Sequence, residues 1–263
     1  MPGSREEGSD GILIQDGIVV GYTGHDMQVE IPEGVTEIGT GAFQNNTGLQ
    51  KVILPVSIRK IGNNAFRGCT GLSEINWDMD SVTIGDYAFY NCGKLTGELI
   101  LPEGTDTVGS YAFYKCTGFT ALRLPAALTS VGSHAFNSCT GLQGLLTIPG
   151  SVETVGDGAF ASCSGLSGLR LEEGIQTIGR EAFYNCAGMQ GALELPDSVT
   201  SLGGSAFSSC KGFESIRLSR NLETLPTHTF FECRGVKGEV VIPDKVTAVG
   251  VLRYFIRYEG LTG

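Results

Sequence analysis

Cysteine has the most chemical potential of any residue type in this 263-residue sequence, because its eight copies recur at a regular step. The step is 23 or 24 residues, and the eight are Cys69, Cys92, Cys116, Cys139, Cys163, Cys186, Cys210 and Cys233. An even number of thiols could form disulfides, and four thiolates could bind zinc. A regular step instead places one thiol in each turn of a repeat, in a single row. A tetrahedral zinc site cannot form from one row, and parallel Cβ directions disfavour the disulfide torsion. We therefore expect eight free, buried thiols, with no metal ion and no other cofactor.

Histidine, the other common catalytic residue, is scarce. The three histidines are His25, His134 and His228. His134 and His228 occupy the same repeat position four turns apart, so they cannot share a ligand or a proton. No Ser/His/Asp or Cys/His arrangement can be assembled, and nothing selects a pair of carboxylates. The sequence thus predicts no catalytic residue and a protein that is not an enzyme.

A column of phenylalanines with the same step indicates the fold class. Its members are Phe43, Phe66, Phe89, Phe113, Phe136, Phe160, Phe183, Phe207 and Phe230. Segments such as Leu122-Arg123-Leu124-Pro125 follow, and their alternation is typical of a strand that proline ends. One such unit cannot bury its apolar side alone, but stacked units share one core. The sequence predicts a mainly β repeat solenoid, with a parallel β-sheet on one face and short helical turns and loops on the other.

Every second repeat carries one additional residue, which explains the alternation between 23 and 24 residues. The additional residue is a glycine before the strand, and it occurs as Gly97, Gly144, Gly191 and Gly238, 47 residues apart. One extra residue at the start of a strand is typical of a β-bulge, and glycine suits that position best. The structural unit is therefore a pair of coils, which indicates growth by duplication.

The full repeat, Leu-Pro-x-x-Val-x-x-Ile-Gly-x-x-Ala-Phe-x-x-Cys-x-x-Leu-x-x-Ile, resembles the BspA-like, or Treponema-type, leucine-rich repeats. The resemblance covers roughly residues 11–263. It implies a secreted or surface protein that binds other proteins, including host or extracellular-matrix proteins, and it offers no catalytic residues. It therefore implies an extracellular or cell-surface location, whereas eight free thiols favour a reducing compartment.

The repeat also divides the chain. Residues 1–10 are polar and are predicted to be a disordered leader. Residues 11–30 contain Asp16-Gly17 between apolar runs, which predicts a β-hairpin that caps the core. Residues 31–250 form the solenoid of about nine coils, and residues 251–263 are a degenerate or truncated tenth repeat.

The outward positions of the predicted strands are the candidate binding surface. They include Ile100, Arg123, Thr147, Arg170, Glu194 and Arg217. Arginine comes at every second strand, and such a basic stripe on an acidic protein suits carboxylates or an acidic protein segment. The alternative is that the arginines are inherited from the duplicated unit, with Glu194 pairing Arg170 and Arg217 across the strands.

Other aromatic residues have two interpretations. Trp77 falls in a leucine column, which predicts packing in the core. Tyrosines flank the Ala-Phe turns on the opposite side of the coil, where they are either anchors for a partner or edge packing. They are Tyr87, Tyr90, Tyr111, Tyr114 and Tyr184.

Composition limits the function classes further. The net charge of −10 argues against nucleic acid and anionic membranes as partners, because both attract basic surfaces. No run of eighteen apolar residues exists, so membrane insertion is not expected. The predicted function is a non-catalytic protein-binding module, acting in adhesion or surface recognition through the strand face. The alternative is a structural spacer or stalk of a larger surface protein.

Overall fold

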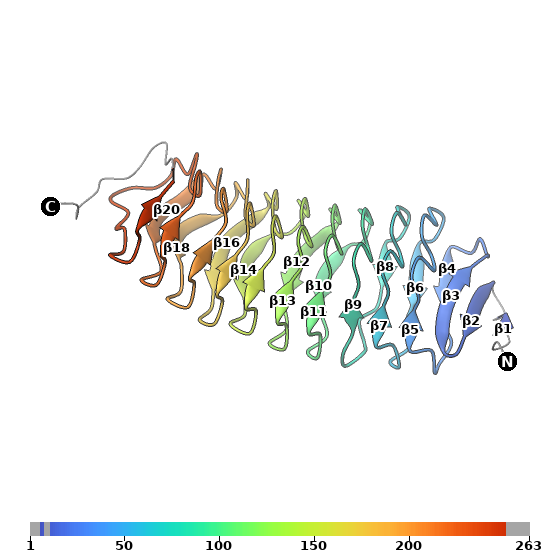
Figure 1. Ribbon diagram of the computed structural model, residues 1–263. Helices are drawn as coiled ribbons and strands as arrows, with labels where there is room; N and C mark the ends of the chain where they lie inside the picture. Colours follow the sequence, from blue (N-terminus) through green and yellow to red (C-terminus); the bar gives the residue numbers. More distant parts are fainter. Residues whose placement is uncertain (1–5, 8–10, 251–263) are drawn as a thin grey trace.

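A computed structural model describes residues 6–7 and 11–250, which form a solenoid of coils stacked in sequence order (Figure 1). The first coil, in blue, and the last described coil, in red, lie at opposite ends of an elongated body. Each coil contributes a short strand, a turn segment around the repeated phenylalanine, and a second strand from the Leu-x-Leu segment. The described residues contain no helix, and hence none that could span a membrane.

The longest sheet is built from the segment that closes each repeat, so we call it the Ile–Gly sheet. Its strands from the repeats are β5 (Glu37–Ile38), β7 (Lys60–Ile61), β9 (Thr83–Ile84), β11 (Thr107–Val108), β13 (Ser130–Val131), β15 (Thr154–Val155), β17 (Thr177–Ile178) and β19 (Ser201–Leu202). They pair in parallel, as in Ile38 opposite Ile61. β21 (Thr224–Leu225) and β22 (Ala248–Val249) form a further parallel pair. A Cβ at Gly132, which follows β13, would lie 2.6 Å from the carbonyl carbon of Gly109 in the preceding coil, so glycine here permits close stacking. The sequence predicted a parallel sheet from the Leu-x-Leu segments alone. The Ile–Gly sheet was not predicted.

The Leu-x-Leu segments form a second set of parallel strands, broken into shorter sheets. These strands are β4 (Gln28–Glu30), β6 (Lys51–Ile53), β8 (Glu74–Ile75), β10 (Gly97–Ile100), β12 (Phe119–Arg123), β14 (Gly144–Ile148), β16 (Leu166–Leu171), β18 (Gln190–Glu194) and β20 (Gly212–Arg217). The sheets are β4-β6-β8, β10-β12, β14-β16 and β18-β20. Each two-stranded sheet begins with a coil that carries the additional glycine. The register slips by one residue directly after Gly97, Gly144 and Gly191, whose φ angles are 85°, 78° and 81°. The predicted bulges are therefore present at these three glycines.

The segments around the phenylalanines are β-turns rather than the short helical turns expected from the sequence. In the coil of Phe66, the Ala65 amide donates to the Gly62 carbonyl (3.2 Å), and the Cys69 amide donates to the Phe66 carbonyl (3.1 Å). Asn64 and Gly68 have φ angles of 57° and 73°. Residues in this left-handed region interrupt a right-handed helix, so three overlapping turns form instead.

The core follows the repeat from coil to coil. The phenylalanine rings stack from Phe43 to Phe207 with centroids 5.2–5.5 Å apart and interplanar angles of 10° or less. All eight of these rings are buried. Removing one such ring should cost about 3–5 kcal/mol of the free energy of unfolding, as for other buried phenylalanines.

The N-terminal end of the core is covered by an antiparallel hairpin of β2 (Ile12–Gln15) and β3 (Ile18–Tyr22). Asp16 and Gly17 form its turn, with φ angles of 52° and 75°, and β3 then pairs in parallel with β5. Tyr22 lies over the first ring of the stack, 5.2 Å from Phe43. β1 (Glu6–Glu7) pairs antiparallel with β2. The rest of the predicted leader and the predicted degenerate repeat at 251–263 lie outside the described residues.

Candidate functional site

The cysteine row is a structural ladder. All eight thiols are free and buried, as predicted, and each donates to the carbonyl of the phenylalanine in the preceding coil, as Cys139 Sγ does to Phe113 at 3.1 Å. Burial raises the pKa of Cys69, Cys139 and Cys233 to about 12, and it raises the pKa of the other five thiols in the same direction. Protonated, enclosed thiols are poor nucleophiles. Within the described part of the chain, no group of three or more His, Cys, Asp or Glu side chains is placed to hold a metal ion.

The predicted binding residues lie on the outer surface of the Leu-x-Leu strands, which we call the strand face. The structure brings them together as three pairs of direct neighbours. Ile100 lies opposite Arg123, Thr147 opposite Arg170, and Glu194 opposite Arg217. Each pair belongs to a separate two-stranded sheet.

The ion pairs on the strand face differ from those expected. Glu194 pairs with neither Arg170 nor Arg217. Instead, Arg217 contacts Asp197 at 3.4 Å, and Arg123 Nε contacts Glu98 Oε1 at 2.6 Å. Two of the three arginines are therefore already partly neutralised by acids of their own surface. Such exposed pairs contribute little to stability.

Asp197 organises the C-terminal part of this face. Arg220 donates through Nε to Asp197 Oδ2 at 2.7 Å, and its backbone amide donates to Oδ1 at 3.0 Å. These hydrogen bonds, with the nearby charges of Arg220 and Arg217, hold the pKa of Asp197 well below its usual range. Asp197 was not identified from the sequence, because the link joins residues 23 positions apart.

The central part of the strand face has a different character. Among the described residues Arg170 has no acidic partner, and its side chain is exposed. Leu145 and Ile100 are 60% and 48% exposed, which is unusual for large apolar side chains in this protein. Leu145 faces outward opposite Gly168, which has no side chain to cover it. We call Ile100, Arg123, Leu145, Thr147 and Arg170 the central patch, of which the sequence analysis missed only Leu145. The bulge at Gly144 was the signal that could have found it, since Leu146 then points inward.

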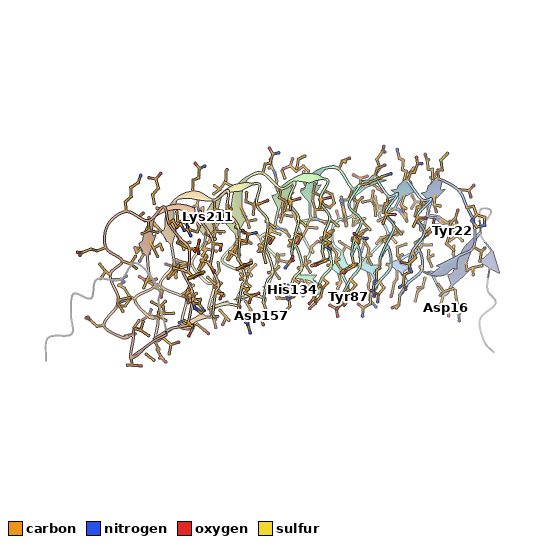
Figure 2. The ribbon with its side chains drawn as sticks, turned by 90° about the horizontal axis from the view of Figure 1, so that it is seen from above. Asp16, Tyr22, Tyr87, His134, Asp157 and Lys211 are labelled. Atoms are coloured by element: carbon orange, nitrogen blue, oxygen red, sulfur yellow. The ribbon has the colours of Figure 1, made fainter. Side chains whose placement is uncertain are left out.

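The tyrosines lie around the turns, away from the strand face. Tyr87 stacks on Tyr111 and Tyr90 on Tyr114, each with ring centroids 4.8 Å apart. The guanidinium of Arg67 lies 5.4 Å from the ring centroid of Tyr87 and 5.2 Å from that of Tyr90. The ring of His134 stacks on Tyr111 with centroids 4.7 Å apart. Figure 2 shows Tyr87 and His134 along the same edge of the solenoid. Because neighbouring side chains cover the ring faces, these four tyrosines join consecutive coils, which supports edge packing.

Comparison with known proteins places the repeat in a family. The family model for the BspA-type leucine-rich repeat region matches residues 26–143 and 143–255, with six copies of the repeat. A leucine-rich repeat protein of T. pallidum is 31% identical with a TM-score of 0.52, covering 73% of this chain and 80% of its own. A leucine-rich cell surface protein of Faecalibacterium prausnitzii is 24% identical with a TM-score of 0.53, covering 94% of this chain and 83% of its own. A leucine-rich repeat protein of Eubacterium ventriosum is 16% identical with a TM-score of 0.56, covering 94% and 93%. The F. prausnitzii and E. ventriosum proteins show a similarity of fold alone. No curated protein matches the sequence.

Proposed function

The chain belongs to the BspA-type leucine-rich repeat family, and from this premise we propose that it is a non-catalytic module that binds another protein through its strand face. Leucine-rich repeats typically act by binding rather than catalysis. The F. prausnitzii structure of the same fold is described as a cell surface protein. That description supports a role for this chain in adhesion or recognition at a cell surface.

The observation that carries the proposal is the composition of the central patch. Inward positions of the strands are occupied by buried apolar residues in coil after coil, whereas the outward positions vary. In the central patch two exposed apolar side chains, Ile100 and Leu145, lie on the same surface as Arg170, a cation without an acidic partner in the described chain. Arginine is enriched at interfaces and among the residues that contribute most to binding, and an exposed apolar patch marks a surface suited to a protein partner. We propose that the partner presents an apolar segment flanked by carboxylates.

Surface plasmon resonance against immobilised extracellular-matrix and host surface proteins tests the proposal. For a protein that binds, Arg170→Glu should weaken the affinity by at least about tenfold, because it replaces an attraction by a repulsion. Arg123→Glu and Arg217→Glu should each have smaller effects, since acids of this chain already neutralise those two arginines. Leu145→Glu should weaken binding without loss of stability, because its side chain is mostly exposed.

Arg180→Glu is the matched control. It makes the same charge change at an equally exposed arginine on the turn side, where Arg180 pairs only with its neighbour Glu181. Unchanged affinity after replacing Arg123, Arg170 and Arg217 together would eliminate the strand face as the site. If Arg180→Glu lowered the affinity as much as Arg170→Glu does, the loss of affinity would reflect overall charge and not the position of Arg170.

A spacer or stalk is the second candidate, and the continuity of the solenoid favours it. The Ile–Gly sheet and the phenylalanine stack both run through the repeats, which gives a stiff body between the two ends. A spacer tolerates a change of sequence on its faces but not of length. Deleting one 47-residue pair of coils should then impair its role in the cell, whereas reversing the charge of Arg170 should not.

A further inference from the structure

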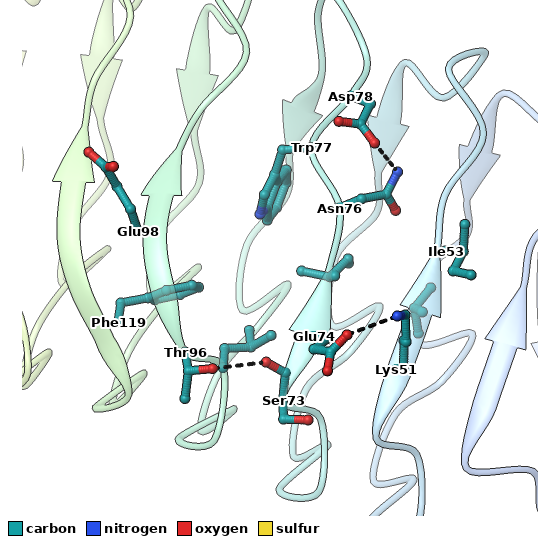
Figure 3. A pocket seen from close by; sticks show the side chains of 13 residues that line it. Lys51, Ile53, Ser73, Glu74, Asn76, Trp77, Asp78, Thr96, Glu98 and Phe119 are labelled. Carbon is teal, nitrogen blue, oxygen red and sulfur yellow. Dashed lines mark hydrogen bonds and ion pairs between the residues drawn. The ribbon is translucent and has the colours of Figure 1, made fainter.

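A pocket of about 410 Å³ opens on the strand face between β8 and β10, towards the N-terminal half of the solenoid (Figure 3). Side chains from neighbouring coils line it. They include Trp77 and Asp78 from the coil of β8, Thr96 and Glu98 from the next coil, and Phe119 from β12. Pockets of this volume are in the range that holds small ligands.

Asn76 ends β8 on the side of the preceding coil. Its side-chain amide donates to the Leu54 carbonyl at 2.9 Å and accepts from the Leu54 amide at 2.7 Å. A side chain thereby takes the place of a strand backbone, and β8 ends at Ile75. The Thr96 amide still donates to the Ser73 carbonyl at 3.3 Å. Beyond it, in the described chain, no backbone hydrogen bond joins β8 to β10.

Trp77 supplies the aromatic wall of the pocket. It occupies a position where neighbouring coils carry leucine, such as Leu54 and Leu101. Its ring packs edge-on against Phe89 at 5.5 Å and tilted against Phe113 at 6.3 Å. The predicted core packing of Trp77 is thus present, but the side chain is only partly buried and also lines the pocket. The indole therefore packs against the core while part of it lines the pocket.

The polar groups around Trp77 are held in place by hydrogen bonds and ion pairs. Asn76 Nδ2 donates to Asp78 Oδ2 at 2.9 Å, and Lys51 contacts Glu74 at 2.9 Å, as the dashed lines in Figure 3 show. Glu98 pairs with Arg123. Both glutamates have a cation already, so a cationic ligand would gain little from them. The carboxylates of Glu74, Asp78 and Glu98, which line the pocket, would repel an anionic ligand.

These features fit a neutral ligand with one apolar face and several hydroxyls. The C–H groups of a pyranose ring are attracted to the negative face of an aromatic ring, and its hydroxyls are donors suited to carboxylate oxygens. We propose that this pocket binds one pyranose ring of a neutral glycan, stacked on Trp77, with hydroxyls donating to Asp78 and Glu98. This site goes beyond the protein-binding function, because its ligand is a sugar and its principal residues lie outside the central patch.

Tryptophan fluorescence tests the proposal directly, because Trp77 is the single tryptophan of the chain. The probes are methyl β-D-glucopyranoside and methyl β-D-galactopyranoside, titrated to about 100 mM, since an affinity in the millimolar range is expected for one sugar ring. At least one should give a saturable change in emission. Methyl β-D-glucuronide, which is anionic, should bind more weakly.

Variants separate this site from the strand-face partner. Asp78→Asn keeps the tryptophan and should weaken sugar binding by about tenfold, because it removes a charged acceptor. Trp77→Ala should abolish the saturation-transfer NMR signals of the sugar, with circular dichroism used to verify that the solenoid remains folded. Arg170→Glu is the matched control and should leave sugar binding unchanged.

The proposal is overturned if neither neutral glycoside changes the emission saturably. It is also overturned if binding survives both pocket variants, or if the glucuronide binds as well as the neutral sugars. None of these results affects the test of protein binding, which depends on Arg170.

Discussion

Raising the pH should unfold this protein cooperatively, because the folded state keeps eight thiols protonated. Burial raises the pKa of each thiol, to about 12 for Cys139, whereas an unfolded chain leaves it at 9.0. The folded-state pKa lies above the unfolded value, so the stabilisation is complete below the unfolded pKa. It is lost as the pH rises from about 9 towards 12, because only the unfolded chain releases the protons.

The size of the effect follows from the number of thiols. At about pH 10 the ionisation of one thiol with an ordinary pKa favours the unfolded chain by about 1.4 kcal/mol, and eight of them by about 11 kcal/mol. A domain is typically stable by about 5–15 kcal/mol. The ladder alone should therefore bring the midpoint of alkaline unfolding close to about pH 10.

Urea unfolding at a series of pH values, followed by circular dichroism under reducing conditions, measures this dependence. The matched variant is Cys139→Ala combined with Cys163→Ala, which removes two of the eight thiols. Its free energy of unfolding is lower at pH 7, because two buried side chains are shortened. Above about pH 10, however, its slope with pH should be shallower by about 1.4 kcal/mol per pH unit for each thiol removed.

A free energy of unfolding that stays constant up to about pH 10.5 would refute the reasoning, since eight ionisable groups could not then differ between the two states. A variant with the same slope as the natural chain would refute it equally. That result would assign the pH dependence to tyrosine or lysine instead of to the thiol ladder.

Five further predictions follow from the coil geometry. Phe136→Ala should lower the free energy of unfolding by about 3–5 kcal/mol in urea, because its ring stacks on a neighbour at 5.2 Å on both sides; a loss below about 1 kcal/mol would contradict the shared core. Gly97→Ala should cost about 1–2 kcal/mol through its φ of 85° alone, as no atom lies within 4 Å of the added Cβ. Gly132→Ala should cost more in the same assay, since its Cβ would meet the backbone of the preceding coil at 2.6 Å. The ionised carboxylate of Asp197 contributes stability above about pH 3.8, and this contribution is lost as the pH falls further, because the pKa of Asp197 is lowered in the folded state. Asp197→Asn should therefore lose less stability below pH 3.8 than the natural chain does. Identical acid unfolding curves for the two proteins would contradict this. A thiol reagent at pH 8 should modify none of the cysteines in the native protein and all eight in denaturant, and rapid native labelling would show that the ladder is open.

The columns that repeat in every coil were predictable, because packing imposes the same requirement on each of them. A phenylalanine and a cysteine at a fixed step can share a core only if the coils stack, and the structure shows both in continuous rows. The glycine bulges were predictable for a related reason. A coil with one added residue can stack in register only if the backbone bulges, and glycine at positive φ permits the bulge without strain.

Features that depend on backbone geometry were harder to predict. The Ile–Gly strands have only two residues each, too few for alternation to show in the sequence. The turns around phenylalanine were expected to be helical, since left-handed φ values at residues such as Tyr87 and Glu181 are not indicated by residue type. Beside Trp77, the side chain of Asn76 replaces backbone hydrogen bonds, and the ion pair of Arg217 depends on a contact across coils. Both are single departures from the repeat, and a repeat pattern indicates only what is shared.

The thiol ladder also bears on the conflict between composition and family that the sequence left open. Free cysteines favour a reducing compartment only where the thiols are accessible and can ionise, because oxidation begins at an exposed thiolate. Here each sulfur is buried, donates to a backbone carbonyl and has a raised pKa. Oxidation would first require two coils to separate, which exposes the phenylalanine stack and costs as much as local unfolding. The ladder can therefore persist in oxidising surroundings, and the eight free thiols are no argument against the surface location that we propose.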